Sequence, residues 1–179
     1  MKLIIIFVSM RASKTVFLAL GSNLGDSWQN LQSAAKKIQT LGRITQISTV
    51  YQTEPVGYKL QPFFLNLVLQ LETDLAALTL LRKCQKIEQQ LGRQKRFQDG
   101  PREIDVDLLF YANEIWQTPE LILPHPRIPK CRFVLEPLAE IAAQKWHPIL
   151  KKTVAELLAE VKDESLVFSF QPSDISKLS

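Results

Sequence analysis

Cysteine is nearly absent from this chain: its 179 residues include only two, Cys84 and Cys131. Two cysteines are too few for the disulfide framework of a small secreted domain, and no group of cysteine and histidine residues has the spacing of a zinc site. With 46% hydrophobic residues, the chain can bury a core without either kind of cross-link. These features favour a globular protein of the reducing cytoplasm.

Long apolar runs are also missing, since none approaches the roughly 20 residues that cross a membrane. The apolar run at residues 3–8 is also shorter than the core of most secretory signals. We therefore expect residues 1–14 to form an N-terminal extension, either disordered or upstream of a translation start at Met10. Residues 15–170 are expected to form one domain, and residues 171–179 a loose tail.

The chain lacks the usual phosphate-binding motifs. The turn "GSNLG", residues 21–25, has no Gly-Lys-Ser/Thr ending, so it is not a P-loop, and no G-x-G-x-x-G is present. We interpret it as a structural turn, with the alternative that the helix beginning after it faces an anion or polar ligand. The net charge of +4 is compatible with a nucleotide, an acidic metabolite or a nucleic acid as ligand.

Hydrophobic periodicity predicts strands and helices in alternation. Strands are expected over residues 15–20, 44–51, 63–73, 104–111 and 166–170, and helices over residues 28–41, 75–91, 133–143 and 153–161. Asp26 or Ser27 is expected to cap the first helix, and Asp74 the second. In residues 63–73 leucines alternate with other residues, which places the leucines in the core.

The order strand, helix, strand, strand, helix, strand is typical of the ferredoxin-like βαββαβ sandwich. This is an α+β fold in which both helices pack on one face of an antiparallel sheet. We expect that fold here, with additional C-terminal elements after the last of these strands.

The stretch "DGPREIDVDLLF", residues 99–110, carries the chemistry. Asp105 and Asp107 are two apart on a predicted strand, so they share a face at roughly 6.6 Å. The opposite face, directed to the core, would hold Ile104, Val106, Leu108 and Phe110. Neighbouring carboxylates raise each other's pKa unless a cation intervenes, and such oxygen ligands suit Mg²⁺. The alternative is an exposed strand face with alternating acids, which is the commoner meaning of an isolated D-x-D.

Basic residues gather on both sides of this strand. Upstream are Arg93, Lys95, Arg96 and Arg102, and "PHPRIPKCRF", residues 124–133, adds His125, Arg127, Lys130 and Arg132. An arginine guanidinium can bind two phosphate oxygens at once. Cations beside carboxylates therefore suit a polyphosphate ligand that carries bound metal ions. The alternative is a solvated basic loop whose charges pair with acids elsewhere.

Several segments in order resemble the 6-hydroxymethyl-7,8-dihydropterin pyrophosphokinase family. They are "ALGSNLGD", "YQTEPVG", "FLNLV", "IEQQLGR", "GPREIDVDLLF" and "LPHPRIPKCRFVLEPL", and they span about residues 16–141. The resemblance implies transfer of the β,γ-pyrophosphoryl group of ATP to the pterin hydroxymethyl oxygen, with release of AMP. It also implies two Mg²⁺ ions, and a monomer with no nucleic acid or membrane partner.

The resemblance also assigns roles to individual residues. The expected metal ligands are Asp105 and Asp107, which with Arg93 and Arg102 form the expected catalytic group. Expected at the ATP site are Gln85, Glu88, Arg93, Lys95, Arg102, Leu108, His125 and Arg132. Expected around the pterin are Thr53, Glu54, Val56, Phe64, Asn66, Asp105 and Phe133, since a flat heterocycle stacks on aromatic rings and an amide reads its polar edge.

The chain departs from the family pattern at five positions. These are Glu54 for a frequent proline, Phe64 for tyrosine, Gln98 for a charged residue, Asp99 for tryptophan or asparagine, and Cys131 for arginine. Arg132, beside Cys131, is a candidate substitute. Two alternatives therefore stay open: a ferredoxin-like nucleic-acid-binding module, and a family member that binds without catalysis.

Overall fold

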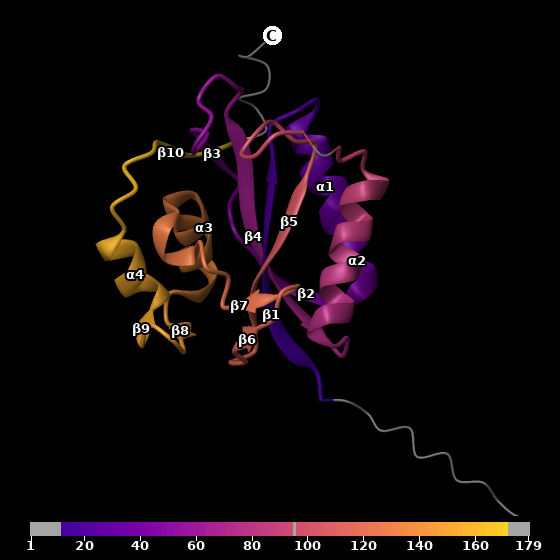
Figure 1. The fold of residues 1–179 in the computed structure, drawn as a ribbon, viewed down its shortest axis with the longest axis vertical. Helices are drawn as coiled ribbons and strands as arrows, with labels where there is room; N and C mark the ends of the chain where they lie inside the picture. Colours follow the sequence, from indigo (N-terminus) through magenta and orange to yellow (C-terminus); the bar gives the residue numbers. More distant parts are fainter. Residues whose placement is uncertain (1–11, 95, 172–179) are drawn as a thin grey trace, which may run out of the picture.

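The computed structural model describes residues 12–94 and 96–171 (Figure 1). The translation start at Met10, most of the N-terminal extension and nearly all of the expected tail lie outside the described residues. Within them, the first strand begins at Lys14, the last residue of the expected extension. No helix among the described residues is long and apolar enough to span a bilayer.

A central antiparallel sheet organises the molecule, with strand order β10-β3-β4-β1-β5 and β2 also paired with β4. Its strands are β1 (Lys14–Ser22), β2 (Arg43–Ile47), β3 (Tyr51–Thr53), β4 (Phe64–Thr73), β5 (Asp105–Tyr111) and β10 (Val167–Ser169). Two small hairpins pair β6 (Trp116–Gln117) with β7 (Ile122–Leu123), and β8 (Trp146–His147) with β9 (Lys152–Thr153). The expected antiparallel sheet is confirmed.

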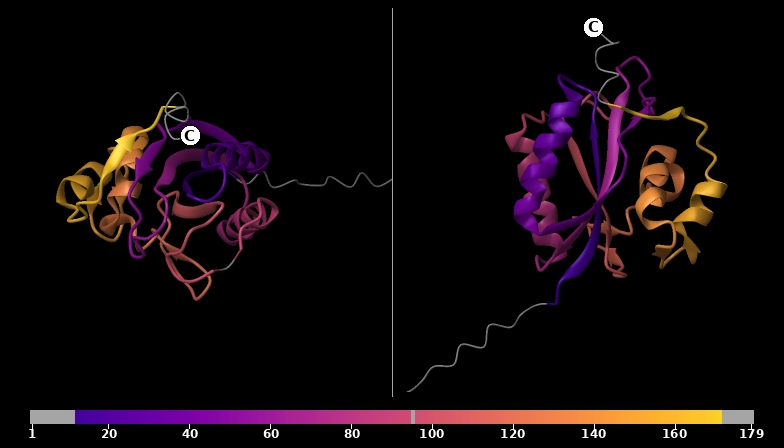
Figure 2. Two further views of the ribbon diagram at one scale, coloured as in Figure 1. Left: turned by 90° about the horizontal axis from the view of Figure 1, so that it is seen from above. Right: turned by 180° about the vertical axis from the view of Figure 1, so that it is seen from behind.

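Helices cover both faces of this sheet (Figures 1 and 2). They are α1 (Ser27–Ile38), α2 (Ala77–Gln90), α3 (Arg132–Ala142) and α4 (Val154–Glu160), with 3-10 turns η1 (Gln39–Leu41) and η2 (Ile128–Lys130). As expected, α1 and α2 share one face. The C-terminal helices α3 and α4 lie on the other, so the non-leucine face of β4 is also covered.

Two local expectations need correction, and a third is confirmed. The strand expected over residues 44–51 is two strands, β2 and β3, because Ser48 interrupts it and its Oγ accepts the Val68 N–H at 3.0 Å. The cap Asp26 is confirmed, since its side chain accepts the Gln29 N–H at 3.0 Å. Asp74 is not a cap: α2 begins at Ala77, and Ala76 occupies the N-cap position.

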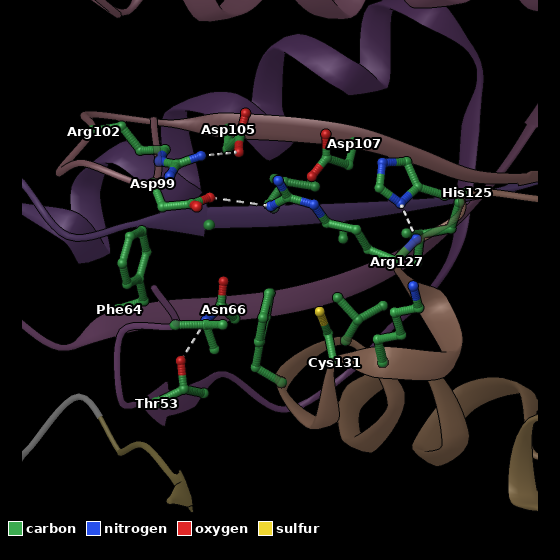
Figure 3. A pocket seen from close by; sticks show the side chains of 18 of the residues that line it. Thr53, Phe64, Asn66, Asp99, Arg102, Asp105, Asp107, His125, Arg127 and Cys131 are labelled. Atoms are coloured by element: carbon green, nitrogen blue, oxygen red, sulfur yellow. Dashed lines mark hydrogen bonds and ion pairs between the residues drawn. The ribbon is translucent and has the colours of Figure 1, made fainter. Parts of the chain in front are cut away.

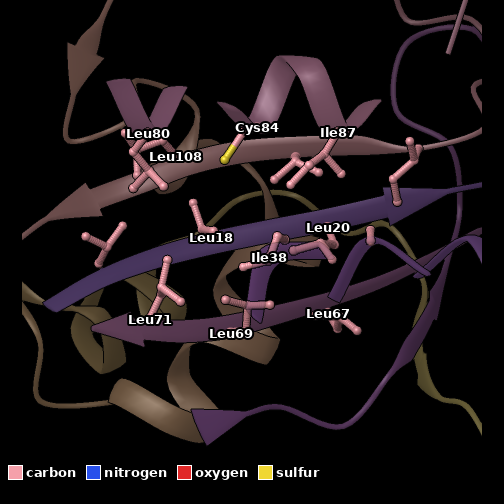
Figure 4. Packing of buried hydrophobic residues seen from close by; sticks show 14 of the residues in the cluster. Leu18, Leu20, Ile38, Leu67, Leu69, Leu71, Leu80, Cys84, Ile87 and Leu108 are labelled. Carbon is pink, nitrogen blue, oxygen red and sulfur yellow. The ribbon is translucent and has the colours of Figure 1, made fainter. Parts of the chain in front are cut away.

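The larger core lies between the sheet and helices α1 and α2 (Figure 4). The leucine face of β4 is buried there, as expected, together with Leu18 and Leu20 of β1 and Cys84 of α2. A side chain such as Leu69, fully buried, contributes about 2 kcal/mol relative to exposure. This core holds the three central strands in the register that builds the site described below.

A second core lies between the sheet and α3, where Phe110 packs against Phe17 at 6.2 Å between ring centroids. Phe110 was expected on the same face as Leu108, and that expectation is wrong. The register between β1 and β5 shifts at this point, since Phe17 pairs with Phe110 while Leu18 pairs with Leu108. Leu109 is therefore the extra residue of a bulge, which turns Phe110 to the other face.

His147 gives the fold a pH dependence. It is 4% exposed, contacts the Phe110 ring edge-on, and its Nδ1 accepts the Leu150 N–H at 3.2 Å, which requires an unprotonated nitrogen. Burial lowers the pKa of His147. The unfolded chain therefore binds a proton more readily, so stability from this residue is complete above the unfolded pKa of about 6.5 and is lost as pH falls below it.

Between pH 7.5 and pH 5.5 we expect His147 to contribute a decrease of about 1 kcal/mol to the free energy of unfolding. Glu88 and Asp107, whose pKa values are raised to about 7, contribute in the opposite direction, so the His147 contribution is measured as a difference between two proteins. Urea titrations at both pH values compare the wild type with His147→Gln, which keeps an acceptor without a titrating ring, and the change with pH should differ between them by about 1 kcal/mol. An equal change in the two proteins would assign the pH dependence to other groups.

Candidate active site

A cavity of about 290 Å³ opens on the α3 face of the sheet. Its walls come from β1, β4 and β5, from the loop of residues 54–63, from the loop of residues 96–102, and from the segment that connects β7 to α3. Segments far apart in the sequence therefore meet around one space (Figure 3).

Small residues on β1 make the floor of this cavity. Along the strand, Phe17, Ala19 and Gly21 alternate with the core residues and decrease in size, so space opens toward the end of the strand. In the sheet, Gly21 pairs with Asn66 on one side and with Asp105 on the other. The Asn66 amide and the Asp105 carboxylate therefore belong to residues on either side of Gly21.

Asn66 is oriented by two neighbours. Its Nδ2 donates to Thr53 Oγ1 at 2.8 Å, and both residues are buried. A Cβ at Gly21 would lie 2.5 Å from Asn66 Oδ1, so the amide has its position because position 21 carries no side chain. Thr53 engages one Nδ2 hydrogen, so Asn66 can offer a ligand its Oδ1 as acceptor and its second Nδ2 hydrogen as donor.

Gly21→Ala should therefore displace the Asn66 amide while the fold persists, because the close atom is the end of a side chain and Gly21 is not in the left-handed region. Loss of one buried hydrogen bond predicts a KM about 10- to 100-fold higher for the pterin that the resemblance implies, with a smaller change in kcat. Steady-state kinetics measures this effect. In an Asn66→Ala background the same substitution should add little; full additivity would contradict the steric explanation.

The carboxylates Asp105 and Asp107 line the cavity from β5, as the strand pattern predicted. Asp105 is held by two arginines, with Arg93 Nη1 at 2.5 Å from Oδ1 and Arg102 Nη1 at 2.7 Å from Oδ2. Asp107 forms no ion pair with any residue that the structure describes. Arginine side chains therefore balance the charge of Asp105 but form no ion pair with Asp107.

Asp107 is open to the cavity, although protein atoms surround it closely. Removal from bulk water and the neighbouring Asp105 raise the pKa of Asp107 to about 7. A cation placed between the two carboxylates would offset both causes. Among the described residues no group of three or more acidic, histidine or cysteine side chains could hold a metal, but Mg²⁺ at nucleotide sites takes one or two carboxylates plus phosphate oxygens and water. Asp105 and Asp107 fit that donor set.

Contacts with other protein groups hold the side chains of Arg93 and Arg102 in place. Arg93 also pairs with Glu88, which is 6% exposed, and Glu88 Oε1 accepts the Val106 N–H at 2.8 Å. Burial raises the pKa of Glu88 to about 7. The Arg102 guanidinium lies 5.6 Å from the centre of the Phe64 ring, which adds a cation–π contact.

His125 is expected to be neutral. Burial and the nearby Arg127 lower the pKa of its imidazole. Its Nδ1 accepts the Arg127 N–H at 3.3 Å, so the proton belongs on Nε2. His125 therefore offers the cavity a neutral N–H donor, not an imidazolium charge.

Arg127 and Asp99 reach toward each other across the cavity and form an ion pair at 3.3 Å (Figure 3). Both also border a second cavity of about 300 Å³. Arg93, Arg96 and Arg102 line this second cavity as well. An arginine-rich cavity therefore lies beside the carboxylate site, with Asp99, Arg102 and Arg127 lining both.

The structure brings most of the expected site residues together. All seven residues expected around the pterin line the first cavity: Thr53, Glu54, Val56, Phe64, Asn66, Asp105 and Phe133. Arg102, Asp107 and His125 line it too, and Arg93 borders the second cavity. Lys95 lies outside the described residues.

Four described residues expected at the ATP site line neither cavity. Leu108 is buried in the larger core, because it faces away from the carboxylates. The guanidinium of Arg132 contacts the Asp163 carbonyl and the Glu136 carboxylate, away from both cavities. Gln85 is exposed on α2, and Glu88 is buried behind Arg93.

Sequence reasoning missed several cavity residues. Ala19 and Gly21 were detectable as small residues at alternate positions of a strand. Arg127 and Lys130 were noticed as cations but not assigned, although they line the cavity beside Cys131. Burial raises the pKa of the Cys131 thiol to about 11, so this residue contributes shape and no negative charge.

Comparison with known proteins identifies the family of this chain. The family model for 7,8-dihydro-6-hydroxymethylpterin-pyrophosphokinase matches residues 17–143. The chain belongs to this family. It is 42% identical over 146 residues to 2-amino-4-hydroxy-6-hydroxymethyldihydropteridine pyrophosphokinase of Aquifex aeolicus, covering 82% of this chain and 91% of that protein. The Bacillus subtilis protein of the same name is 42% identical over 130 residues, or 72% and 78% of the two chains.

Some relatives are much longer. The chain is 35% identical to the folic acid synthesis protein fol1 of Schizosaccharomyces pombe over 86% of its own length, but spans only 21% of that protein. Among solved structures, HPPK-DHPS of Plasmodium falciparum matches with a TM-score of 0.68 at 15% identity, over 86% of this chain and 45% of that one. This structural likeness supports the fold alone.

Proposed function

We infer that this chain is an ATP-dependent pyrophosphokinase of folate biosynthesis. It transfers pyrophosphate from ATP to the hydroxymethyl group of 6-hydroxymethyl-7,8-dihydropterin, giving the pterin diphosphate and AMP. The observation that carries this function is the composition of the first cavity, in a chain that belongs to this family. The cavity has an oriented amide at one end and an arginine-flanked carboxylate pair at the other.

At the pterin end, we assign recognition of the ring to Asn66, whose Oδ1 accepts a ring N–H, with Thr53 holding the amide. Phe64 and Phe133 are assigned to stacking on the ring faces, and Val56 to its apolar contact. Glu54 accepts the Leu166 N–H at 3.2 Å, so we assign it to positioning the loop against β10.

At the phosphate end, we assign Asp105 and Asp107 to two Mg²⁺ ions. Bound Mg²⁺ would neutralise the triphosphate and align it for attack on the β-phosphorus. Arg93, Arg102 and His125 are assigned to holding phosphate oxygens, where preorganised donors stabilise charge that develops toward AMP. Lys130 forms no ion pair with a described residue and lines the cavity, so it is a further cation for this task.

The fine classification of the fold and the assembly state are also proposals. Strand order β5-β1-β4-β2, with antiparallel pairs and α1 and α2 on one face, supports the ferredoxin-like βαββαβ arrangement. We propose a monomer that takes small molecules. A nucleic-acid ligand is disfavoured because Asp105 and Asp107 would repel its phosphates unless a metal ion intervened, and such a module has no need of this carboxylate pair.

The test is AMP release from ATP and Mg²⁺, with and without 6-hydroxymethyl-7,8-dihydropterin. AMP that depends on the pterin, with formation of the pterin diphosphate, is the expected result. Folded protein that releases no AMP would contradict the proposed function and favour the noncatalytic family member, whereas steeply salt-dependent binding of RNA would favour the nucleic-acid module.

A further inference from the structure

The chain after α4 passes the start of α3 and forms β10 beside β3 (Figures 1 and 2). Residues 163–170 are called the C-terminal strap below. Both elements that the strap reaches contribute to the wall of the first cavity, since Thr53 belongs to β3 and Phe133 to α3. The contacts of the strap therefore indicate how these two parts of the wall are held.

At its first residue, the strap caps α3. The N-cap residue of this helix, Cys131, makes no capping hydrogen bond with its side chain. Instead, Asp163 Oδ2 accepts the N–H of Arg132, the first residue of the helix, at 2.9 Å. Asp163 Oδ1 accepts the Ser165 N–H at 3.0 Å, which holds the carboxylate in this orientation. A carboxylate at this position pairs a free N–H and is favoured by the helix dipole. The strap thus fixes the turn that carries Phe133.

The other end of the strap holds β3. This strand has three residues and lies between β4 and β10, with Thr53 opposite Val167. Beyond the pairing, the Phe170 N–H donates to the Val50 carbonyl at 2.7 Å. The Phe170 ring is 5% exposed and lies 5.8 Å from the Trp28 ring of α1, between centroids. Buried contacts therefore anchor the strap on the opposite face of the sheet from α3.

The helix α3 is tied to β3 at both of its ends. Near its last residue, Glu140 accepts the Tyr51 hydroxyl of β3 at 3.0 Å. At its first residue, the tie runs through Asp163 and the strap. The start is the end of α3 that lines the cavity, through Phe133 and Val134. The cap at Asp163 is therefore the tie that governs the cavity wall.

The phosphate end of the cavity rests on a different element. Asp105 and Asp107 belong to β5, and the His125 N–H donates to the carbonyl of Leu109 in the same strand at 2.9 Å. Within the described part of the chain, the hydrogen bonds of Asp163 are made with the start of α3 and with its own segment. Loss of Asp163 is therefore expected to move the α3 wall and to leave the β5 carboxylates in place.

We propose that Asp163 is a positioning residue for the pterin: through the C-terminal strap it holds the start of α3 at the separation from β3 that the ring requires. This inference rests on the proposed function, in which Phe133 stacks on the ring and Thr53 orients the Asn66 amide that reads its edge. Stacking depends on the distance between the rings, so a loosened α3 start weakens pterin binding.

The experiment measures pterin affinity in the full chain by calorimetry, with Mg²⁺ and saturating α,β-methylene-ATP. The methylene group replaces the oxygen that transfer would cleave, so binding is measured without reaction. For Asp163→Ala we expect affinity for 6-hydroxymethyl-7,8-dihydropterin to fall about 5- to 10-fold, the scale of a lost helix cap. The KM for the pterin should rise by the same factor, while kcat and the affinity for the analogue stay within about twofold.

Two further variants distinguish positioning from general stability. Asp163→Asn keeps an acceptor for the Arg132 N–H and is itself a good cap, so it should retain pterin affinity within about twofold. Thr153→Ala removes a cap of similar strength from α4, where Thr153 Oγ1 accepts the Glu156 N–H at 3.2 Å and lines neither cavity. It should lower the melting temperature about as much as Asp163→Ala does, but leave pterin affinity unchanged.

The outcomes separate this inference from the proposed function. Unchanged pterin affinity in Asp163→Ala, or an equal loss in Asp163→Asn or Thr153→Ala, would overturn the inference even when pterin-dependent AMP release is intact. Absence of AMP release in the wild type would overturn the proposed function, and the affinity measurement, which needs no turnover, would still decide the inference. Failure of the wild type to bind the pterin would overturn both.

Discussion

Replacing Asp107 with alanine should lower kcat/KM for pterin-dependent AMP formation by about 1,000-fold and should not destabilise the fold. The loss corresponds to roughly 4 kcal/mol, which is the scale of charge stabilisation by a bound metal. Asp107 makes no ion pair with a described residue, and its pKa is raised to about 7 by removal from water and by Asp105. Its removal therefore relieves repulsion inside the folded protein, while no ion pair within the described residues is lost.

Steady-state kinetics with varied Mg²⁺ and a urea titration together test this prediction. Asp74→Ala, an exposed acid with no side-chain hydrogen bond among the described residues, is the matched control and should leave both measurements unchanged. Asp107→Asn keeps the shape and removes the charge, so it should resemble alanine in rate. A rate within tenfold of the wild type in Asp107→Ala would place the metal elsewhere.

Most of the fold was predictable because its determinants are local. Alternation in β4 placed the leucines in the core, and the same rule placed Asp105 and Asp107 on a shared face. Asp26 acts through a hydrogen bond to a residue three positions away, so its capping role was visible in the sequence. Asp74 failed as a cap because α2 begins later, at Ala77.

What sequence could not supply depends on contacts between distant segments. The bulge at Leu109 reverses the facing of Phe110, and nothing in the strand pattern marks it. The sequence suggested that Arg132 is a free cation beside Cys131. Its Nε, however, donates to the carbonyl of Asp163, 31 residues later in the chain. The partner of β10 was equally hidden, since β3 lies far earlier in the chain.

Gln85 and Glu88, which the family resemblance assigned to the ATP site, differ in burial. One turn apart on α2, they were expected to border ATP together, but Gln85 is exposed and Glu88 is 6% exposed. Glu88 accepts the Val106 N–H and pairs with Arg93, so it fixes β5 and an arginine of the site at the same time. Its role is to position Arg93 from within the protein.

Glu88→Ala should therefore lower the free energy of unfolding by about 3 kcal/mol, because it leaves a buried N–H without its acceptor and Arg93 without a buried partner. For a chain of this size that loss corresponds to a melting temperature lower by roughly 6 to 12 °C. Gln85→Ala, on the same helix but exposed, should change stability by less than about 0.5 kcal/mol. Thermal melting and urea titration measure both variants.

Glu88→Gln separates the two contributions of this side chain. It preserves an acceptor for the Val106 N–H and removes the charge that holds Arg93, so it should lose less stability than alanine while still weakening nucleotide binding. If Gln85→Ala reduced the affinity for ATP and Glu88→Ala left stability unchanged, α2 would border the nucleotide directly, as the family resemblance implied. If Glu88→Gln matched alanine in stability, the ion pair would outweigh the hydrogen bond, and Arg93 would be the group through which α2 stabilises β5.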